Sequence, residues 1–132
     1  MRVAFYGLAL IVATTSAAWA AGETCKADPE PVVMPLADFE KLDVDKGKAA
    51  TADLFKDIKL YQTANEAFRA CLGKEMDAIK AKGDKVSEAE KAAYGKMADE
   101  YNASVEREQA IAKSANAMLD SLCARGDKPS CP

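Results

Sequence analysis

The residues best suited to chemistry in this chain are its four cysteines, because the sequence contains no histidine. Without histidine there is no Ser–His–Asp triad, no Cys–His dyad and no imidazole ligand for zinc or haem. Structural zinc sites and redox-active dithiols usually place cysteines in CxxC pairs, and no such pair occurs here. An even number of cysteines in a small exported protein favours two disulfides instead. The four residues are Cys25, Cys71, Cys123 and Cys131.

The acidic residues do not form a recognisable catalytic or metal-binding pattern. The densest group is Asp38, Glu40, Asp43 and Asp45, and it lacks the DxDxDG order of a calcium-binding loop. Acid–base catalysis needs two carboxylates that converge in a cleft. The sequence therefore predicts no catalytic residue, no cofactor and no metal ligand, and we expect a protein that is not an enzyme.

The overall charge narrows the class of partner. The 132 residues include 18 Lys and Arg against 21 Asp and Glu, a net charge of −3. A nucleic-acid-binding protein normally has a basic face, so this balance argues against nucleic acid as a partner. The length is that of one small domain.

The first 20 residues predict a secretory signal peptide. Arg2 is followed by an apolar run, and Ala18-Trp19-Ala20 supplies the small-x-small site that signal peptidase cleaves. The apolar run of about ten residues is shorter than the roughly 20 needed to span a bilayer. We expect cleavage after Ala20, a periplasmic or secreted mature protein, and no stable membrane insertion after cleavage.

Residues 21–50 predict an irregular, proline-rich lead-in. Pro29, Pro31 and Pro35 each remove a backbone hydrogen-bond donor. Apolar residues at every third position after Pro35 predict one short helical turn, and Gly47 is expected to end it.

Residues 51–82 predict a long helix, because apolar residues recur in them at spacings of three and four. Thr51 is placed to cap the start of this helix, and Gly83 is placed to end it. Gly73 is a weak point within it, since glycine in a helix interior costs about 1 kcal/mol relative to alanine.

Residues 87–124 predict a second long helix with the same periodicity. Ser87 and Glu90 match the S-x-x-E capping box at its start. The two helices make residues 51–125 a long antiparallel helical hairpin, and residues 126–132 form a C-terminal tail. The predicted fold is thus all-α, with a proline-rich N-terminal strap and stabilisation by disulfides.

The short link between the helices also predicts which residues face each other. A turn at residues 84–85 places Asn65 beside Ser104 and Tyr61 beside Glu108, so polar interruptions of the two apolar faces fall on consecutive levels. These four residues are a candidate polar inter-helix cluster. They could form a small pocket, but a single polar layer in a helical core commonly fixes register, and we favour that interpretation.

The same register favours one disulfide pairing among the three that four cysteines allow. If both helices are continuous, Cys71 lies about 37 Å from Cys123. That is too far for Cys71 to bond to either Cys123 or Cys131. Cys25 precedes the first helix and can run back along it. We therefore expect Cys25–Cys71 and Cys123–Cys131, with the lead-in acting as a strap. That strap is expected to cover Phe55, Phe68 and Met76.

Three segments carry a resemblance to a known group of proteins. They are Cys25-Lys26-Ala27-Asp28-Pro29, Ala70-Cys71-Leu72 and Tyr101-Asn102-Ala103-Ser104-Val105. In these segments the chain resembles short exported bacterial proteins of uncharacterised function, in which a Cys-containing, proline-rich start is followed by two helices. The resemblance implies a fold type and a compartment but no activity. Relative to that pattern, Cys123 and Cys131 are an addition.

The tripeptide Arg125-Gly126-Asp127 matches the motif that integrin-binding proteins display in loops. Gly126 has a second explanation as the C-terminal cap of the second helix, with Arg125 in the last turn. We favour the capping explanation.

Three classes of function fit these features. The first is a non-enzymatic envelope protein that binds or builds through its helical surfaces, with another protein or a second copy as partner. A four-helix bundle of two copies would bury Phe55, Met76 and Met118. The second is a periplasmic holdase-type chaperone or inhibitor, which the polar tip at residues 82–85 disfavours. The third is a small-ligand binder or enzyme that uses the polar inter-helix cluster.

Overall fold

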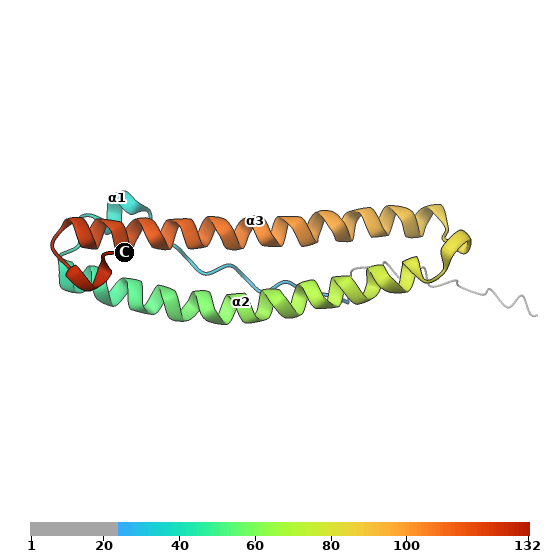
Figure 1. Cartoon of the computed structure of the whole chain (residues 1–132), viewed down its shortest axis with the longest axis horizontal. Coiled ribbons are helices and arrows are strands. Elements are labelled where there is room, and N and C mark those ends of the chain that lie inside the picture. The colour runs from blue at the N-terminus through green and yellow to red at the C-terminus, as the bar shows by residue number, and fades with distance from the viewer. Residues whose placement is uncertain (1–23) are drawn as a thin grey trace, which may run out of the picture.

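The computed structural model describes residues 24–132, and in this part of the chain it is all-helical, as predicted. Two helices of 37 residues each dominate it, α2 (Val44–Lys80) and α3 (Glu88–Ala124). They run antiparallel as one long hairpin (Figure 1). The predicted signal peptide, residues 1–20, lies outside the described residues.

Three short elements complete the fold. α1 (Leu36–Phe39) precedes the hairpin and is the short turn predicted after Pro35. The 3₁₀ turn η1 (Gly83–Lys85) connects the two long helices at what we call the tip, and η2 (Lys128–Ser130) follows α3. α1 and η2 both lie at the opposite end, which we call the terminal end (Figure 1).

The first long helix begins seven residues before the predicted start at Thr51. Asp43 caps it, because its side chain accepts a hydrogen bond of 2.8 Å from the backbone N–H of Lys46. The Thr51 hydroxyl instead donates back to the carbonyl of Gly47, as threonines inside helices often do.

Gly47 was expected to end the short helical turn after Pro35, but it lies inside α2. A Cβ atom at this position would lie 2.9 Å from Leu122 Cδ2 and 3.3 Å from the Phe39 ring. Glycine is therefore present because α1, α2 and α3 approach closely there. Its role is one of packing, and the interpretation of Gly47 as a helix breaker was wrong.

The boundaries at the tip agree closely with the sequence. Gly83 adopts a φ of +54°, in the left-handed region that favours glycine. Ser87 and Glu90 form the complete capping box, each side chain accepting from the other residue's backbone N–H. The short turn therefore aligns the two helices antiparallel.

Buried residues form two clusters along the hairpin, separated by polar residues at its middle. The core near the terminal end, here called the terminal core, contains Phe39, Leu54, Ile58, Tyr61, Ile111, Ala115, Met118 and Leu122. The core nearer the tip, here called the tip core, contains Cys25, Phe68, Leu72, Ile79 and Met97.

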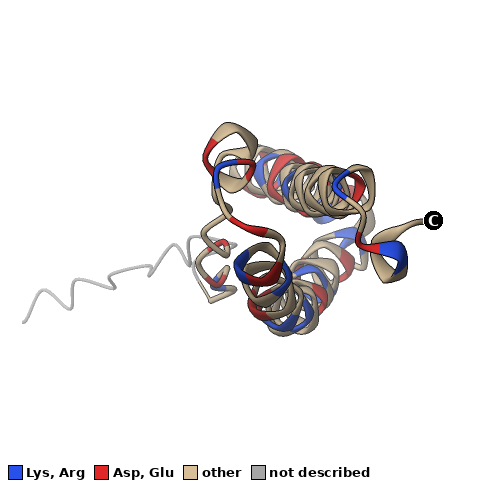
Figure 2. Cartoon of the chain, turned by 90° about the vertical axis from the view of Figure 1, so that its left-hand side faces the viewer, with Lys and Arg blue, Asp and Glu red and all other residues tan. Residues whose placement is uncertain are grey.

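Charged residues of both signs occur on both long helices. Seen along the hairpin from the terminal end, Lys and Arg are interspersed with Asp and Glu on α2 and on α3 (Figure 2). In this view the charges of residues 24–132 do not divide the hairpin into one acidic and one basic side.

Both disulfides follow the pairing that the register favoured. Cys25 is bonded to Cys71, and Cys123 is bonded to Cys131. Residues 24–35, here called the strap, lead from α1 back along the hairpin to the Cys25–Cys71 bond (Figure 1). On this path Glu30 forms an ion pair of 3.5 Å with Arg107 of α3.

The strap covers part of what was expected. Phe68 lies in the tip core with Cys25, and Met76 packs against that core. Phe55 instead lines an open hollow together with Ala52, Lys56, Lys59 and Leu60 of α2, and no strap residue lines this hollow.

Within residues 24–132, no helix combines the length and the apolar character that crossing a membrane requires.

Candidate functional site

The polar residues at the middle of the hairpin form a buried layer between the two cores. Asn65 is 3% exposed and Ser104 is fully buried. Asn65 Nδ2 donates to the Ser104 carbonyl at 3.1 Å and to Glu108 Oε2 at 3.0 Å. The Ser104 hydroxyl donates to the carbonyl of Tyr101 at 2.7 Å. Asn65 therefore lies beside Ser104, in the register that the sequence predicted.

Arg69 completes this layer and was not among the predicted residues. Its Nη1 lies 2.8 Å from Glu108 Oε2, and both side chains are largely buried. Burial disfavours the charged form of Glu108, but hydrogen bonds from Arg69 and Asn65 outweigh that effect and lower its pKa. Arg69 follows Asn65 by one helical turn, so i,i+4 spacing was the signal that pointed to it.

Tyr61 does not join the layer, although the sequence placed it beside Glu108. It is buried in the terminal core and lines a hollow under the strap with Pro29 and Pro31. Glu108 instead lines a second hollow, which lies on the other side of α2. The two residues thus lie at nearby levels but point to opposite sides of the hairpin.

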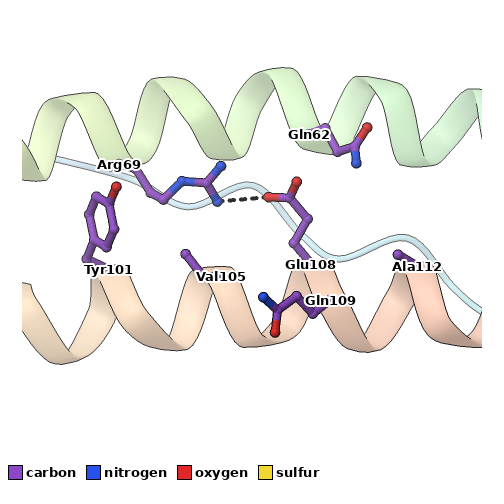
Figure 3. A pocket seen from close by; sticks show the side chains of 7 residues that line it. All are labelled: Gln62, Arg69, Tyr101, Val105, Glu108, Gln109 and Ala112. Atoms are coloured by element: carbon purple, nitrogen blue, oxygen red, sulfur yellow. Dashed lines mark hydrogen bonds and ion pairs between the residues drawn. The ribbon is translucent and has the colours of Figure 1, made fainter.

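A hollow of about 370 Å³ opens beside the polar layer (Figure 3). In it Arg69 from α2 and Glu108 from α3 point toward each other, and their contact joins the helices. Tyr101 is 38% exposed and forms one wall of the hollow. The other lining residues are Gln62, Val105, Gln109 and Ala112.

The chemistry available in this hollow is limited. The carboxylate and the guanidinium already neutralise each other, and the lowered pKa keeps Glu108 charged and paired rather than poised to take up a proton. Among residues 24–132, Arg125 Nη2 is the one buried side-chain nitrogen or oxygen without a hydrogen-bond partner. The polar layer is therefore satisfied within the chain, as a register-fixing element would be.

A second cluster brings together Cys25, Cys71 and Glu75, with their ligand atoms within 4.8 Å of one another. The two sulfurs are bonded to each other, so neither is a thiolate that can bind a metal. Glu75 accepts a hydrogen bond from the Thr24 hydroxyl and lies 3.5 Å from Cys25 Sγ. This cluster fastens the strap to α2.

The Arg-Gly-Asp tripeptide turns its charges inward. Arg125 Nη1 donates to the Leu42 carbonyl at 2.6 Å, and its guanidinium lies 5.4 Å from the centre of the Phe39 ring. Gly126 has a φ of +101°, as the capping interpretation requires.

Asp127 is held in the same way. It is 8% exposed and pairs with Lys48 at 3.3 Å. A hydrogen bond from the Ser130 hydroxyl and this pairing lower its pKa. The tripeptide thus locks the terminal end and does not present its charged groups as an adhesion loop would.

No family model, curated protein or solved structure matches this chain.

Proposed function

We propose that this chain is an exported, non-enzymatic protein of the cell envelope that binds a protein partner, or builds a structure, through its helical surfaces. The observation that carries the proposal is the position of the exposed apolar side chains. Leu60 on α2 is 64% exposed and Val32 on the strap is 94% exposed. Pro31, the neighbour of Val32 in the strap, lines a hollow with Leu60. We call Pro31, Val32 and Leu60 the strap–α2 surface.

The cores of the hairpin support this choice. Met118 was expected to be buried by a partner, but it is 3% exposed and lies inside the terminal core. The chain therefore buries Met118 in its own core, while Val32 and Leu60 remain exposed. Large exposed apolar side chains that share one surface are characteristic of protein-interaction sites.

The disulfides and the predicted signal peptide support a location outside the cytosol. Two disulfides in a small domain favour an oxidising environment. The predicted signal peptide gives a route of export, and periplasm or secretion is the proposed destination. The resemblance to exported bacterial helical proteins points the same way.

The other two classes have weaker support. A holdase is expected to expose apolar residues at the hairpin tip or along one face, and residues 82–85 at this tip are polar and exposed. A small-ligand site needs unpaired polar groups in a concave pocket. The hollow beside the polar layer is open, and its two charges are already paired.

Affinity capture from the native envelope tests the proposal. The disulfide-bonded wild-type chain is compared with a double variant that carries Val32→Glu and Leu60→Glu. Lys113→Glu, at an exposed position on α3, is the matched control. We expect a partner to be retained by the wild type and the control and lost by the double variant. Retention of the same proteins by all three chains would contradict a role for the strap–α2 surface.

A further inference from the structure

The side of α2 that faces away from α3 is exposed from Ala49 to Ala78, and in this stretch it carries little charge. Nine residues at spacings of three and four form this side, here called the outer face of α2. They are Ala49, Ala52, Lys56, Leu60, Thr63, Ala67, Ala70, Lys74 and Ala78, and all are exposed.

The corresponding side of α3 has a different composition. Asp99, Glu106, Lys113 and Asp120 recur there every seven residues, and all are exposed. Such a charged side is the ordinary solvent-facing surface of an amphipathic helix. The outer face of α2 departs from that pattern, since alanine, threonine and leucine occupy most of it.

Charged residues along the edge of this face are ordered by sign. Lys48 and Lys59 lie in its N-terminal half, while Glu66 and Asp77 lie in its C-terminal half. The members of each pair are eleven residues apart, which is about three helical turns and so one side of the helix. Lys59 and Glu66 take part in no ion pair within residues 24–132.

The order of charges along α2 is complementary to the order along a second copy of α2 that runs in the opposite direction. Two copies of α2 that run antiparallel, related by a two-fold axis between Gln62 and Thr63, bring Lys59 of each copy to Glu66 of the other. The same axis brings Lys48, which also pairs with Asp127 in its own chain, toward Asp77 of the other copy. Opposite charges that meet across such a contact favour this orientation and this register over others.

The sizes of the side chains are complementary in the same register. In the N-terminal half, Phe55 and Leu60 border the hollow of about 400 Å³. In the C-terminal half, Ala70 is exposed, and a Cβ added at Gly73 would meet nothing within 4 Å. The two-fold axis places the small residues of one copy over the large residues of the other, so the helices can approach closely.

We propose that the outer face of α2 binds the same face of a second copy of this chain, in an antiparallel dimer centred near Thr63. The inference rests on the proposed function, since it names the partner of one helical surface. It differs from the bundle expected from the sequence, because the dimer buries Leu60 and Ala67 instead of Met76 and Met118. The interface is isologous, which is the usual geometry of a two-fold dimer.

Charge reversal tests the pairing by oligomeric state, measured by size-exclusion chromatography with light scattering. Lys59→Glu brings two carboxylates together across the interface, and Glu66→Lys brings two ammonium groups together, twice in each dimer. We expect each variant to raise the dissociation constant about tenfold. Lys113→Glu on α3 is the matched control and is expected to leave it unchanged. Circular dichroism verifies that all the variants keep their helices.

Two combinations make this test specific. A chain that carries both reversals restores the opposite pairing and is expected to dimerise like the wild type. An equimolar mixture of the two single variants is expected to form a heterodimer, because an acidic edge then meets a basic edge. Failure of both combinations to associate would overturn the proposed register.

A cross-link tests the position of the two-fold axis. All four native cysteines are in disulfides, so Thr63→Cys adds a single free thiol. Mild oxidation is expected to link two copies through this new thiol, whereas the control Asn102→Cys on the outside of α3 is expected to remain unlinked. Equal linking of both variants would overturn the interface.

The failure of this inference and the failure of the proposed function give different results. A wild-type chain that stays monomeric at high micromolar concentration, while the strap–α2 surface still captures a partner, contradicts the dimer only. A monomeric chain whose captured proteins are the same for every variant contradicts both.

Discussion

The tip of the hairpin is closed by residues a few positions apart, whereas the terminal end is closed by residues up to 83 positions apart. At the tip, the Ser87–Glu90 capping box and the left-handed Gly83 are sufficient to reverse the chain. All of these contacts lie within the turn and the first residues of α3, and the residues of η1 are exposed.

The terminal end depends on three elements that are distant in sequence. Phe39 of α1 is fully buried among residues of α2 and α3. Arg125, just after α3, holds the carbonyl of Leu42, and Gly47 lets Leu122 approach α2. The comparison teaches that the same hairpin uses local sequence signals at one end and tertiary packing at the other. Substitutions at the two ends should therefore differ in cost.

The largest effect is expected at the terminal end. Phe39→Ala removes a fully buried ring and leaves a cavity among three helices, so we expect a loss of about 3–5 kcal/mol in the free energy of unfolding. Urea denaturation measures it. Leu36→Ala in the same short helix is the control, since Leu36 is 40% exposed and its loss should cost far less. Equal costs would show that α1 does not seal the core.

Two glycines in α2 should respond to alanine with opposite signs. Gly47→Ala forces a Cβ to within 2.9 Å of Leu122, and we expect a loss of about 1–3 kcal/mol despite the better helix propensity. Gly73→Ala meets open space and should gain up to about 1 kcal/mol. Thermal unfolding of both variants measures the contrast. A gain at both positions would remove the close-approach explanation for Gly47.

A smaller effect is expected at the tip. Ser87→Ala removes the cap of α3, and we expect a loss of about 1 kcal/mol. Ser114→Ala is a useful comparison, because this exposed serine lies within α3 and donates back to Ala110. Its replacement should be neutral or slightly stabilising. Denaturation of the two variants side by side decides whether the capping box contributes as the geometry indicates.

The smallest effect is expected from acid. The Lys82 ammonium and the backbone N–H of Ser87 lower the pKa of Glu90 from 4.5 to about 2. A lowered pKa in the folded state stabilises the fold above the unfolded value, and this contribution is lost as the pH falls from about 4.5 through about 2. Glu90→Gln should flatten this part of the stability profile, measured by denaturation at a series of pH values. An unchanged profile would show that Glu90 is not held by these partners.

The contrast between the two ends also explains what the sequence predicted about the fold. The end of α3, the cap at Ser87 and the turn at Gly83 depend on neighbouring residues, and their positions follow from sequence motifs. The N-cap of α2 at Asp43 is also local, but it was missed because Gly47 was interpreted as a break. The reason for glycine at position 47 is the approach of Leu122, which is far away in sequence. No local pattern distinguishes a glycine that breaks a helix from one that admits a neighbouring side chain.

The polar layer shows the same limit at the candidate site. The length of the turn fixed the register, which placed Asn65 beside Ser104 correctly. It did not fix the rotation of side chains about each helix axis, so Tyr61 was assigned to the wrong side. Arg69 was missed because a charged residue beside an apolar one is normally expected to face solvent.

The two disulfides have a mechanical consequence for the hairpin. A force applied between Thr24 and Pro132 enters α2 through the Cys25–Cys71 bond and leaves α3 through the Cys123–Cys131 bond. The segments between bonded cysteines are bypassed, so the load passes through the last turns of α2, the tip and α3. It pulls α2 toward the tip and α3 toward the terminal end. Tension then shears the two helices past each other, and resistance to it depends on the Asn65 and Arg69 contacts to Glu108.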